Sequence, residues 1–393
     1  MTHESGSRQT GTTPTAEPKH ATERGSSECS SAKILLVTKK LDESPNGGRE
    51  LLCKLNYDTL REIYGTGLSL FELEPDTSSG ISKYTNAIRG YIDGLNAETV
   101  ADILEKLKTG KIDKLFIDGS NLGSLAKMVK KRVPSVEIYT FFHNVESAFF
   151  WGSFTQIWTP KSLVVLVVNF LVERKSVSYS DHIICLSSRD SAMLQKIFGR
   201  KADHLSAMAM EDKFEGVSTV SKRPVDGQYV LFVGGVFFAN LAGIKWFVDK
   251  VASHLQVKVV VVGRGFEQYK EELERNGNVQ VVGTVDSMAQ WYVNADFVIA
   301  PIFGGSGMKT KVAEALMFGK KIVGTPEAFS GYESITNRVG CICEDAEQFL
   351  TAIEAVCAID NAAFDSDLRD IYENNYSINA ARKRLLEIMA EPQ

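Results

Sequence analysis

The stretch PIFGGSGMKTKVAEALMFGKKIVGT, from Pro301 to Thr325, joins an apolar run at 297–300 to a helix-like segment through a turn of closely spaced glycines. Glycine lets backbone N–H groups approach a ligand, and the start of a helix favours negative charge. Lys309 and Lys311 add positive charge beside this turn, and Glu314 can accept hydrogen bonds from hydroxyl groups. These groups together favour a ligand with phosphate at one end and a sugar ring at the other.

An ordinary structural explanation of the same stretch stays open. Glycine turns between a strand and a helix occur in doubly wound sheets, and lysines on helices are usually solvated. Several apolar residues here also follow the spacing of a helix face that points to a core, namely Met308, Val312, Ala315 and Leu316. Alone, the stretch therefore predicts a strand–turn–helix unit and leaves its ligand undecided.

The composition is that of a globular protein, with 393 residues of which 44% are hydrophobic and 24% charged. This length suffices for two domains of ordinary size. The net charge of −5 provides no basic field, so we expect no nucleic-acid partner. Residues 1–31 contain almost no large apolar side chain, which predicts a disordered tail without the apolar segment of a signal peptide.

The six cysteines are scattered, and none forms a C-x-x-C pair. This pattern indicates neither a zinc site nor a disulfide framework. We therefore expect no bound metal and a cytoplasmic location, where thiols stay reduced.

Short apolar strands alternate with helical patterns along the chain. The predicted strands are 33–38, 68–73, 114–117, 137–142, 182–186 and 203–206 in the first half, and 229–233, 257–262, 279–282, 297–300, 321–324 and 340–343 in the second. One helix between successive strands implies right-handed βαβ units and parallel sheets. We expect an α/β protein with two Rossmann-like domains facing a cleft, where the carboxyl ends of the strands present the ligand site.

The division between the domains is predicted at 215–228, where small and polar residues with a proline and a glycine indicate a linker. The amino-terminal domain then spans 32–216 and the carboxy-terminal domain 226–375. A final helix at 376–393 is expected to pack back toward the first domain.

Polar residues follow several strands of the first half. Gly47 and Gly48 make either a second glycine-rich turn facing the cleft or an ordinary loop. His143 follows the fourth predicted strand, where it is either a ligand-binding residue or a structural one. Asp118 and Asn121 follow the third strand, and we expect them to cap the next helix.

Similar residues follow the strands of the second half. Gly235 can bring a backbone amide to a phosphate, and Asn240 is expected to cap the following helix. Arg264 either meets a base or a phosphate, or lies in a plain turn. A nicotinamide fingerprint would need glycine at Gln268, which argues against a dinucleotide oxidoreductase, and no G-x-x-x-x-G-K-[ST] loop occurs. The turn 187–190 is expected to cap a helix.

The segment SLVVLVVNFLV at 162–172 is strongly apolar but only about half as long as a membrane span. A buried helix is the favoured interpretation. Because aromatic residues precede it from Phe149 onward, the alternative is a surface over 149–172 that touches a membrane or a lipid-linked acceptor.

Taken together, these motifs resemble the GT-B-fold glycosyltransferases of the large retaining group called family 4. The resemblance is carried by GSGMKTKVAEALMFGKKIVGT, VLFVGGVFFANLAGIKWF, VVVGRGF, VVGTVDSMAQWYVNADFVIAP and FFHNVE. It extends from Lys33 to the end of the chain. The resemblance implies that the first domain lies on the acceptor side and that the second binds a nucleotide-sugar.

The resemblance also implies roles for individual residues. Glu314 matches the carboxylate that holds the ribose, and His143 matches a histidine near the donor sugar with a part in stabilising the transition state. The helix start that receives the diphosphate is matched by Gly305, Ser306, Gly307, Met308 and Lys309. The loop of the first domain that closes over the donor is matched by Gly47 and Gly48. Many members carry glutamate where this chain has Ser306, and an Arg/Lys pair where it has Gly235 and Asn240. The positive charge would then come from Lys309, with Lys311.

The implied reaction is transfer of a hexose, with retention, from a UDP- or GDP-sugar to a carbohydrate or lipid-linked acceptor in polysaccharide or glycoconjugate biosynthesis. No cofactor or metal is expected, because a helix start and lysines can neutralise the leaving diphosphate. The expected location is cytoplasmic, including the inner face of a membrane. Two alternatives stay open: a nucleotide-sugar 2-epimerase of the same fold, and a non-catalytic partner subunit of another glycosyltransferase.

Overall fold

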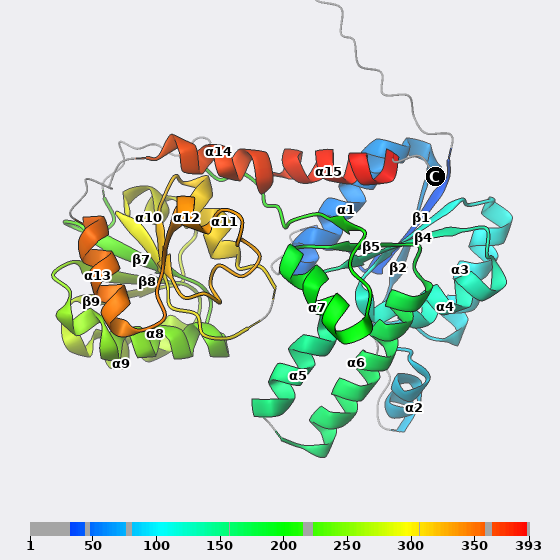
Figure 1. Cartoon of the computed structure of the whole chain (residues 1–393), viewed down its shortest axis with the longest axis horizontal. Coiled ribbons are helices and arrows are strands. Elements are labelled where there is room, and N and C mark those ends of the chain that lie inside the picture. The colour runs from blue at the N-terminus through cyan, green and yellow to red at the C-terminus, as the bar shows by residue number, and fades with distance from the viewer. Residues whose placement is uncertain are drawn as a thin grey trace, which may run out of the picture.

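The computed structural model describes residues 32–43, 48–75, 81–156, 158–214, 223–305, 307–357 and 364–390. Within them, two parallel sheets of six strands each form the centres of two lobes (Figure 1). The predicted tail 1–31 and most of the predicted linker lie outside the described residues, so the predicted domain limits stay predictions. The α/β architecture with two Rossmann-like domains is confirmed.

The first lobe is built on a sheet of order β2-β1-β3-β4-β5-β6. Its strands are β1 (Ile34–Lys39), β2 (Leu68–Leu73), β3 (Lys114–Asp118), β4 (Glu137–Phe142), β5 (His182–Cys185) and β6 (His204–Leu205). Its helices are α1 (Gly48–Tyr64), α2 (Ile81–Arg89), α3 (Ala97–Gly110), α4 (Gly123–Arg132), α5 (Glu146–Gln156), α6 (Pro160–Tyr179) and α7 (Ser188–Phe198).

The second lobe is built on a sheet of order β12-β11-β10-β7-β8-β9. Its strands are β7 (Tyr229–Val233), β8 (Lys258–Val262), β9 (Val279–Gly283), β10 (Phe297–Ala300), β11 (Ile322–Gly324) and β12 (Gly340–Ile342). Its helices are α8 (Phe238–Lys250), α9 (Lys270–Leu273), α10 (Ala289–Asn294), α11 (Thr310–Met317), α12 (Thr336–Val339) and α13 (Ala346–Cys357). Each predicted strand is present, because strands buried on both faces are continuous apolar runs.

The strand order places a topological switch point in each sheet. In the first lobe the chain passes from β1 to β2 on one side and then to β3 on the other. In the second lobe the chain passes from β7 to β8 and β9 on one side and then to β10 on the other side of β7. Ligands bind at the carboxyl ends of strands beside such points. The loops that follow β1, β3, β7 and β10 are therefore the natural ligand-binding loops of this chain.

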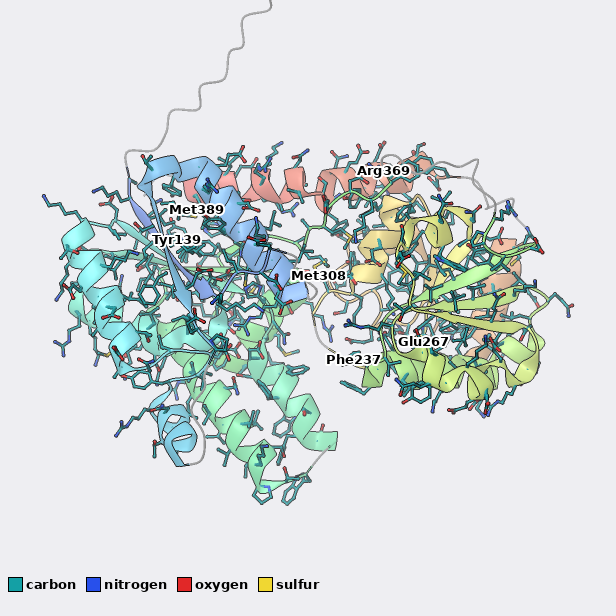
Figure 2. The ribbon with its side chains drawn as sticks, turned by 180° about the vertical axis from the view of Figure 1, so that it is seen from behind. Tyr139, Phe237, Glu267, Met308, Arg369 and Met389 are labelled. Atoms are coloured by element: carbon teal, nitrogen blue, oxygen red, sulfur yellow. The ribbon has the colours of Figure 1, made fainter. Side chains whose placement is uncertain are left out.

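Two helices near the carboxyl terminus run from the second lobe across to the first (Figure 1). Helix α14 (Ser366–Asn375) is tied to the chain between the lobes by an ion pair of Arg369 with Asp212. Helix α15 (Ile378–Ala390) contacts α1, and the Lys114 ammonium group donates to the carbonyl of Met389 at 3.1 Å. Figure 2 labels Arg369 and Met389 near the two ends of this crossing segment. The crossing ties the two lobes together at one side of the molecule.

Helices α5 and α6 project together from the first lobe (Figure 1). The carboxylate of Glu173 on α6 is fully buried and accepts the backbone N–H groups of Glu146 and Ser147 at 2.9 Å, which caps the start of α5. The interpretation of 162–172 as a buried helix is wrong for its outer face, because the amino-terminal part of α6 projects with α5 from the lobe (Figure 1). Large exposed apolar residues there are Trp151, Trp158, Leu163, Val164, Val167 and Leu171. The carboxyl-terminal part of α6 is buried against α4.

Among the helices that the structure describes, none combines the length and the apolar character needed to span a membrane.

Candidate active site

A pocket of about 300 Å³ lies between the two lobes. The first lobe lines it with Gly48, Arg49, Leu52, His143, Asn144, Glu146, Phe149 and Leu186, and the second with Phe237, Gly307, Met308 and Thr310. A neighbouring pocket of about 370 Å³ extends from Arg189 to Phe238, Gly305 and Gly307. Figure 2 shows Met308 between the lobes. The expected cleft is therefore present, and it brings the glycine turn, Gly48 and His143 to one place.

The glycine turn after β10 adopts a backbone that favours glycine. Gly305 and Gly307 have φ of 122° and 65°, in the left-handed region. The Lys309 ammonium group folds back over the turn and donates to the Gly307 carbonyl at 2.9 Å. Helix α11 starts directly after Lys309, whose own side chain does not cap the helix. The turn thus leads into the start of a helix beside a lysine.

The charge of Lys309 is balanced by an ion pair in this structure. Its ammonium group lies 2.9 Å from a carboxylate oxygen of Glu327. The other oxygen of Glu327 lies 3.1 Å from the guanidinium of Arg189, which belongs to the first lobe. Burial lowers the pKa of Lys309, while Glu327 opposes that shift. An anionic ligand that binds Lys309 therefore competes with Glu327 for its positive charge.

Lys311 is buried and lies behind the turns that follow β7 and β10. Its ammonium group donates to the side-chain oxygen of Asn240 at 2.9 Å and stands 4.6 Å from the centre of the Phe232 ring. Asn240 in turn donates to the carbonyl of Gly235 at 2.9 Å. The expectation that Asn240 caps the next helix is wrong, because α8 has no side-chain cap and Asn240 is used to fix the turn after β7.

The remaining residues predicted in the second lobe lie around these turns. Glu314, on α11, accepts a hydrogen bond from the buried hydroxyl of Tyr292 at 2.7 Å, which fixes its carboxylate. Arg264 is exposed after β8, and its carbonyl accepts the N–H of Val236 at 3.0 Å, so it lies beside Gly235. Gly47 and Ser306 lie outside the described residues.

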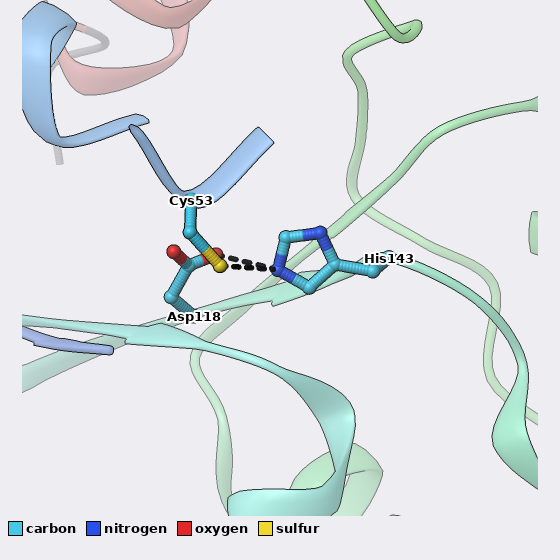
Figure 3. A group of neighbouring side chains, drawn as sticks. All are labelled: Cys53, Asp118 and His143. Atoms are coloured by element: carbon cyan, nitrogen blue, oxygen red, sulfur yellow. Dashed lines mark hydrogen bonds and ion pairs between the residues drawn. The ribbon is translucent and has the colours of Figure 1, made fainter. Parts of the chain in front are cut away.

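His143 is held by a buried carboxylate. Its Nε2 atom lies 2.7 Å from Oδ1 of Asp118 and 3.7 Å from Sγ of Cys53 (Figure 3). Asp118 also accepts hydrogen bonds from Thr38 at 2.9 Å and from Asn56 at 3.1 Å. Burial alone would raise the pKa of Asp118, but His143 and the other donors outweigh it and lower the pKa. Asp118 is thus a fixed anion that orients the imidazole.

The expectation that Asp118 and Asn121 cap the next helix is wrong. The short turn and the helix that follow β3 have no side-chain caps, because Asp118 points to His143 and Asn121 to Asp93. The predicted cap at Ser187 is confirmed, since its hydroxyl accepts the N–H of Asp190. The sequence pattern did not indicate the partnership of Asp118 with His143. The available signal was their position, since each stands at the carboxyl end of a strand, and the two strands β3 and β4 are adjacent in the sheet.

Cys53, Asp118 and His143 are the one group in the described part of the chain whose ligand atoms lie close enough to hold a metal ion, within 4.8 Å. Their present contacts form a closed hydrogen-bond network around Asp118. Burial raises the pKa of the Cys53 thiol, which keeps it protonated and makes it a poor metal ligand. The donor set therefore suits a hydrogen-bonded cluster better than a metal centre.

Glu146 stands at the start of α5, beside His143 in the interlobe pocket. Burial raises its pKa to about 7, and the nearby Arg49 opposes this shift. A carboxyl group with a pKa near neutrality can take up or release a proton during a reaction.

Comparison with known proteins shows which domain and which fold the chain resembles. Residues 227–358 match the family model described as Glycosyl transferases group 1. Sucrose-phosphate synthase from Thermosynechococcus elongatus is similar in structure with a TM-score of 0.65 at 15% identity, over 91% of this chain and 98% of that chain. The Anabaena protein HepE, in complex with UDP, gives 0.62 at 14%, over 91% and 99%. WaaG, a glycosyltransferase involved in lipopolysaccharide biosynthesis, gives 0.62 at 14%, over 91% and 100%.

These similarities fix the fold as that of GT-B glycosyltransferases, in agreement with the two facing lobes. The match over 227–358 identifies a group 1 glycosyltransferase domain in the carboxy-terminal lobe and supports a transferase enzyme. A search of the curated proteins finds no match to the sequence.

Proposed function

We propose that this protein transfers a hexose from a UDP- or GDP-sugar to a carbohydrate or lipid-linked acceptor, with retention, in polysaccharide or glycoconjugate biosynthesis. The observation that carries this proposal is a single interlobe cleft that joins the glycine turn at the start of α11 to the His143–Asp118 pair. The structure of HepE, which shares the fold, was determined with UDP bound. A nucleotide-sugar is the donor that such a cleft suits.

In this proposal the second lobe holds the donor. The carboxylate of Glu314, already fixed by Tyr292, accepts hydrogen bonds from the ribose hydroxyls. The turn from Gly305 to Lys309 receives the diphosphate, because helix-start amides favour negative charge. Lys309 leaves Glu327 and pairs with the phosphates. Lys311 acts from behind by holding Asn240 against Gly235, and Arg264 borders the same turn.

The first lobe supplies the groups beside the donor sugar. His143 is oriented by Asp118, and its Nδ1 atom is buried without a hydrogen-bond partner among the described residues. A hydroxyl group of the donor sugar would satisfy this atom. As the diphosphate departs, positive charge develops on the sugar ring, and the Asp118 anion behind the imidazole favours that charge. Gly48 lines the same pocket at the start of α1, and closure of the two lobes over the donor would exclude water.

A donor screen tests this function. Nucleotide release is measured with UDP- and GDP-hexoses, and UDP or GDP should stabilise the protein against heat by about 2.7 kcal/mol at about 100 times its Kd. Glu314→Ala should lose this stabilisation while keeping its circular dichroism spectrum. Lys270→Met, an exposed change on the same lobe, is the control. Absence of stabilisation by any nucleotide would overturn the proposal. Binding without turnover would favour the partner subunit, and a product epimerised at C2 of the sugar, still joined to the nucleotide or released from it by water, would favour the 2-epimerase.

We also propose that the α5–α6 hairpin contacts a membrane, at the inner face of which the enzyme would work. Trp158 is 82% exposed and Trp151 is 59% exposed, beside the exposed leucine and valine side chains of α6. Exposed apolar patches of this kind mark interaction surfaces, and tryptophan favours the membrane interface.

Sedimentation with vesicles of phosphatidylcholine and phosphatidylglycerol tests this contact. The wild type should sediment with the vesicles, and the double variant Trp151→Ser/Trp158→Ser should lose most of that binding. Ile342→Ser, which changes an exposed apolar residue on the other lobe, is the matched control. Equal binding of all three proteins would contradict the contact.

A further inference from the structure

Arg189 brings a positive charge of the first lobe to the glycine turn of the second lobe. It stands in the first turn of α7, which follows β5, and β5 is adjacent to β4 in the sheet. It lines the interlobe pocket of about 370 Å³ together with Gly305 and Gly307. Among the residues that line this pocket, it is the one arginine or lysine. The first lobe therefore places a cation beside the turn that is proposed to receive the diphosphate.

Arg189 and Lys309 share one carboxylate, that of Glu327. One oxygen of Glu327 lies 3.1 Å from Nη2 of Arg189, and the other lies 2.9 Å from Nζ of Lys309. The Lys309 ammonium group also donates to the carbonyl of Gly307 at 2.9 Å. A single carboxylate thus bridges cations from different lobes at the edge of the glycine turn. The two cations are close enough together for one small anion to contact both.

The position of Glu327 allows a ligand to replace it. This residue follows β11, the strand adjacent to β10, and its side chain is 19% exposed. Within the described part of the chain, the hydrogen-bond partners of its carboxylate are Arg189 and Lys309. A phosphate group offers a pair of oxygens at a spacing similar to that of a carboxylate, and it forms equally charged hydrogen bonds. A phosphate in the cleft can therefore take over both contacts when Glu327 moves away.

The other cations around the turn are less suited to this contact. Lys311 is buried behind the turns, and Arg264 lines neither interlobe pocket. Arg49 lines the other interlobe pocket and already pairs with a carboxylate. Each phosphate of a nucleotide-sugar carries a negative charge, and burial of a charge without a partner is costly. A second cation beside Lys309 would offset that cost, and Arg189 is the cation best placed to supply it.

We infer that Arg189 binds the terminal phosphate of the nucleoside diphosphate, in the place that Glu327 occupies in this structure. The inference rests on the proposed function and adds a first-lobe residue to its diphosphate site. A guanidinium group can donate two parallel hydrogen bonds to a phosphate, which suits it to this role. Because the glycine turn belongs to the second lobe, a diphosphate held by Arg189 also joins the two lobes. A nucleoside monophosphate, which lacks the terminal phosphate, gains nothing from this contact.

Isothermal titration calorimetry on the full chain tests the inference, with UDP compared with UMP and GDP compared with GMP. Arg189→Met should raise the Kd of the diphosphate that the protein binds by about tenfold, as the loss of a charged hydrogen bond predicts. The Kd of the matching monophosphate should change less than about twofold. Arg189→Lys should recover part of the lost affinity, because an ammonium group keeps the charge. Arg132→Met, an exposed change at the end of α4, is the matched control and should change neither Kd.

The double variant Glu327→Gln/Arg189→Met separates a phosphate contact from a role in holding Glu327. If Arg189 contacts the phosphate, the double variant should bind the diphosphate about tenfold more weakly than Glu327→Gln alone. If the two bind it equally well, Arg189 only positions Glu327 and the inference is overturned. An equal loss of affinity for the monophosphate would overturn it as well.

Failure of this inference is distinguishable from failure of the proposed function. If the wild type binds neither UDP nor GDP, the proposed function fails and the inference falls with it. If the wild type binds one of them and Arg189→Met binds it equally well, the inference alone fails. Arg189→Gln, a second uncharged variant, replaces Arg189→Met if that variant does not keep the circular dichroism spectrum of the wild type.

Discussion

The Nε2 atom of His143 lies 2.7 Å from Oδ1 of Asp118, at the carboxyl ends of the adjacent strands β4 and β3. The carboxylate is completely buried, and the imidazole lines the interlobe pocket. A buried anion behind a histidine fixes the orientation of the ring and favours positive charge in front of it. The pair therefore links the interior of the first lobe to the place where the donor sugar is proposed to react.

Replacing Asp118 with asparagine should lower turnover by about 100-fold, as expected when an oriented histidine loses its partner. The KM for the donor should change much less, because Asp118 touches no ligand. Asparagine keeps the size of the side chain, so the fold should persist. Thr38→Val removes another hydrogen bond to the same carboxylate and should have a far smaller effect. Equal losses of turnover in the two variants would show that Asp118 contributes to packing in this region and does not orient His143.

Removing the Lys309 ammonium group should weaken nucleotide binding. A hydrogen bond to a charged group contributes about 1.5–3 kcal/mol, so Lys309→Met should raise the Kd for UDP or GDP by about tenfold or more. Isothermal titration calorimetry measures this directly. Lys270→Met serves as the control, since that lysine is 58% exposed.

The partner variant Glu327→Gln should have the opposite effect. Glu327 competes with the diphosphate for Lys309 and Arg189, so its neutralisation should lower the nucleotide Kd. The same titration measures the change. Weaker binding by Glu327→Gln would mean that the carboxylate holds the turn in its binding shape and does not compete.

The burial of Lys311 should make stability depend on pH. Burial lowers its pKa from 10.5 to about 7. Between these two values the unfolded chain binds the proton and the folded chain does not, so this residue's contribution to stability rises with pH. Below about pH 7 both states are charged, and burial of the charge costs the most. Lys311→Met should therefore have a higher free energy of unfolding than the wild type. This difference should be largest at pH 6 to 7 and should shrink toward pH 10.

Denaturant unfolding of both proteins across this pH range gives that difference, in which the other titrating groups cancel. A difference that stays constant with pH would show that Lys311 keeps its proton in the folded state. In that case its bond to Asn240 would be a charged one at every pH tested.

Chelation of metal ions should not change the rate of transfer. Helix-start amides and Lys309 neutralise the leaving diphosphate in our proposal, and the Cys53–Asp118–His143 group is already closed by hydrogen bonds. Nucleotide release is measured before and after treatment with EDTA. A loss of activity that returns with added Mg²⁺ or Mn²⁺ would contradict this prediction.

Much of the fold was predictable because parallel strands covered on both faces are continuous apolar runs. The runs at 229–233 and 297–300, for example, are strands with these same limits in the structure. The turn after 297–300 was predictable for a similar reason. Its left-handed backbone at Gly305 and Gly307 excludes most other residues, so closely spaced glycines indicate it. Apolar strands and glycine turns are local properties, which the composition and spacing of a short stretch indicate.

The partners of the polar side chains were decided only by the tertiary structure. Asp118 and Asn240 both looked like helix caps, yet they hold His143 and the turn at Gly235. Glu327 occupies Lys309, although the two are 18 residues apart. The outer face of the amino-terminal part of α6 is exposed because this part projects from the lobe, although its sequence suits a core. Strand order and lobe orientation bring these groups together, and neither is encoded in any short stretch. The sequence by itself therefore determined the elements and their class, while the contacts that orient the site depended on how the chain closes in space.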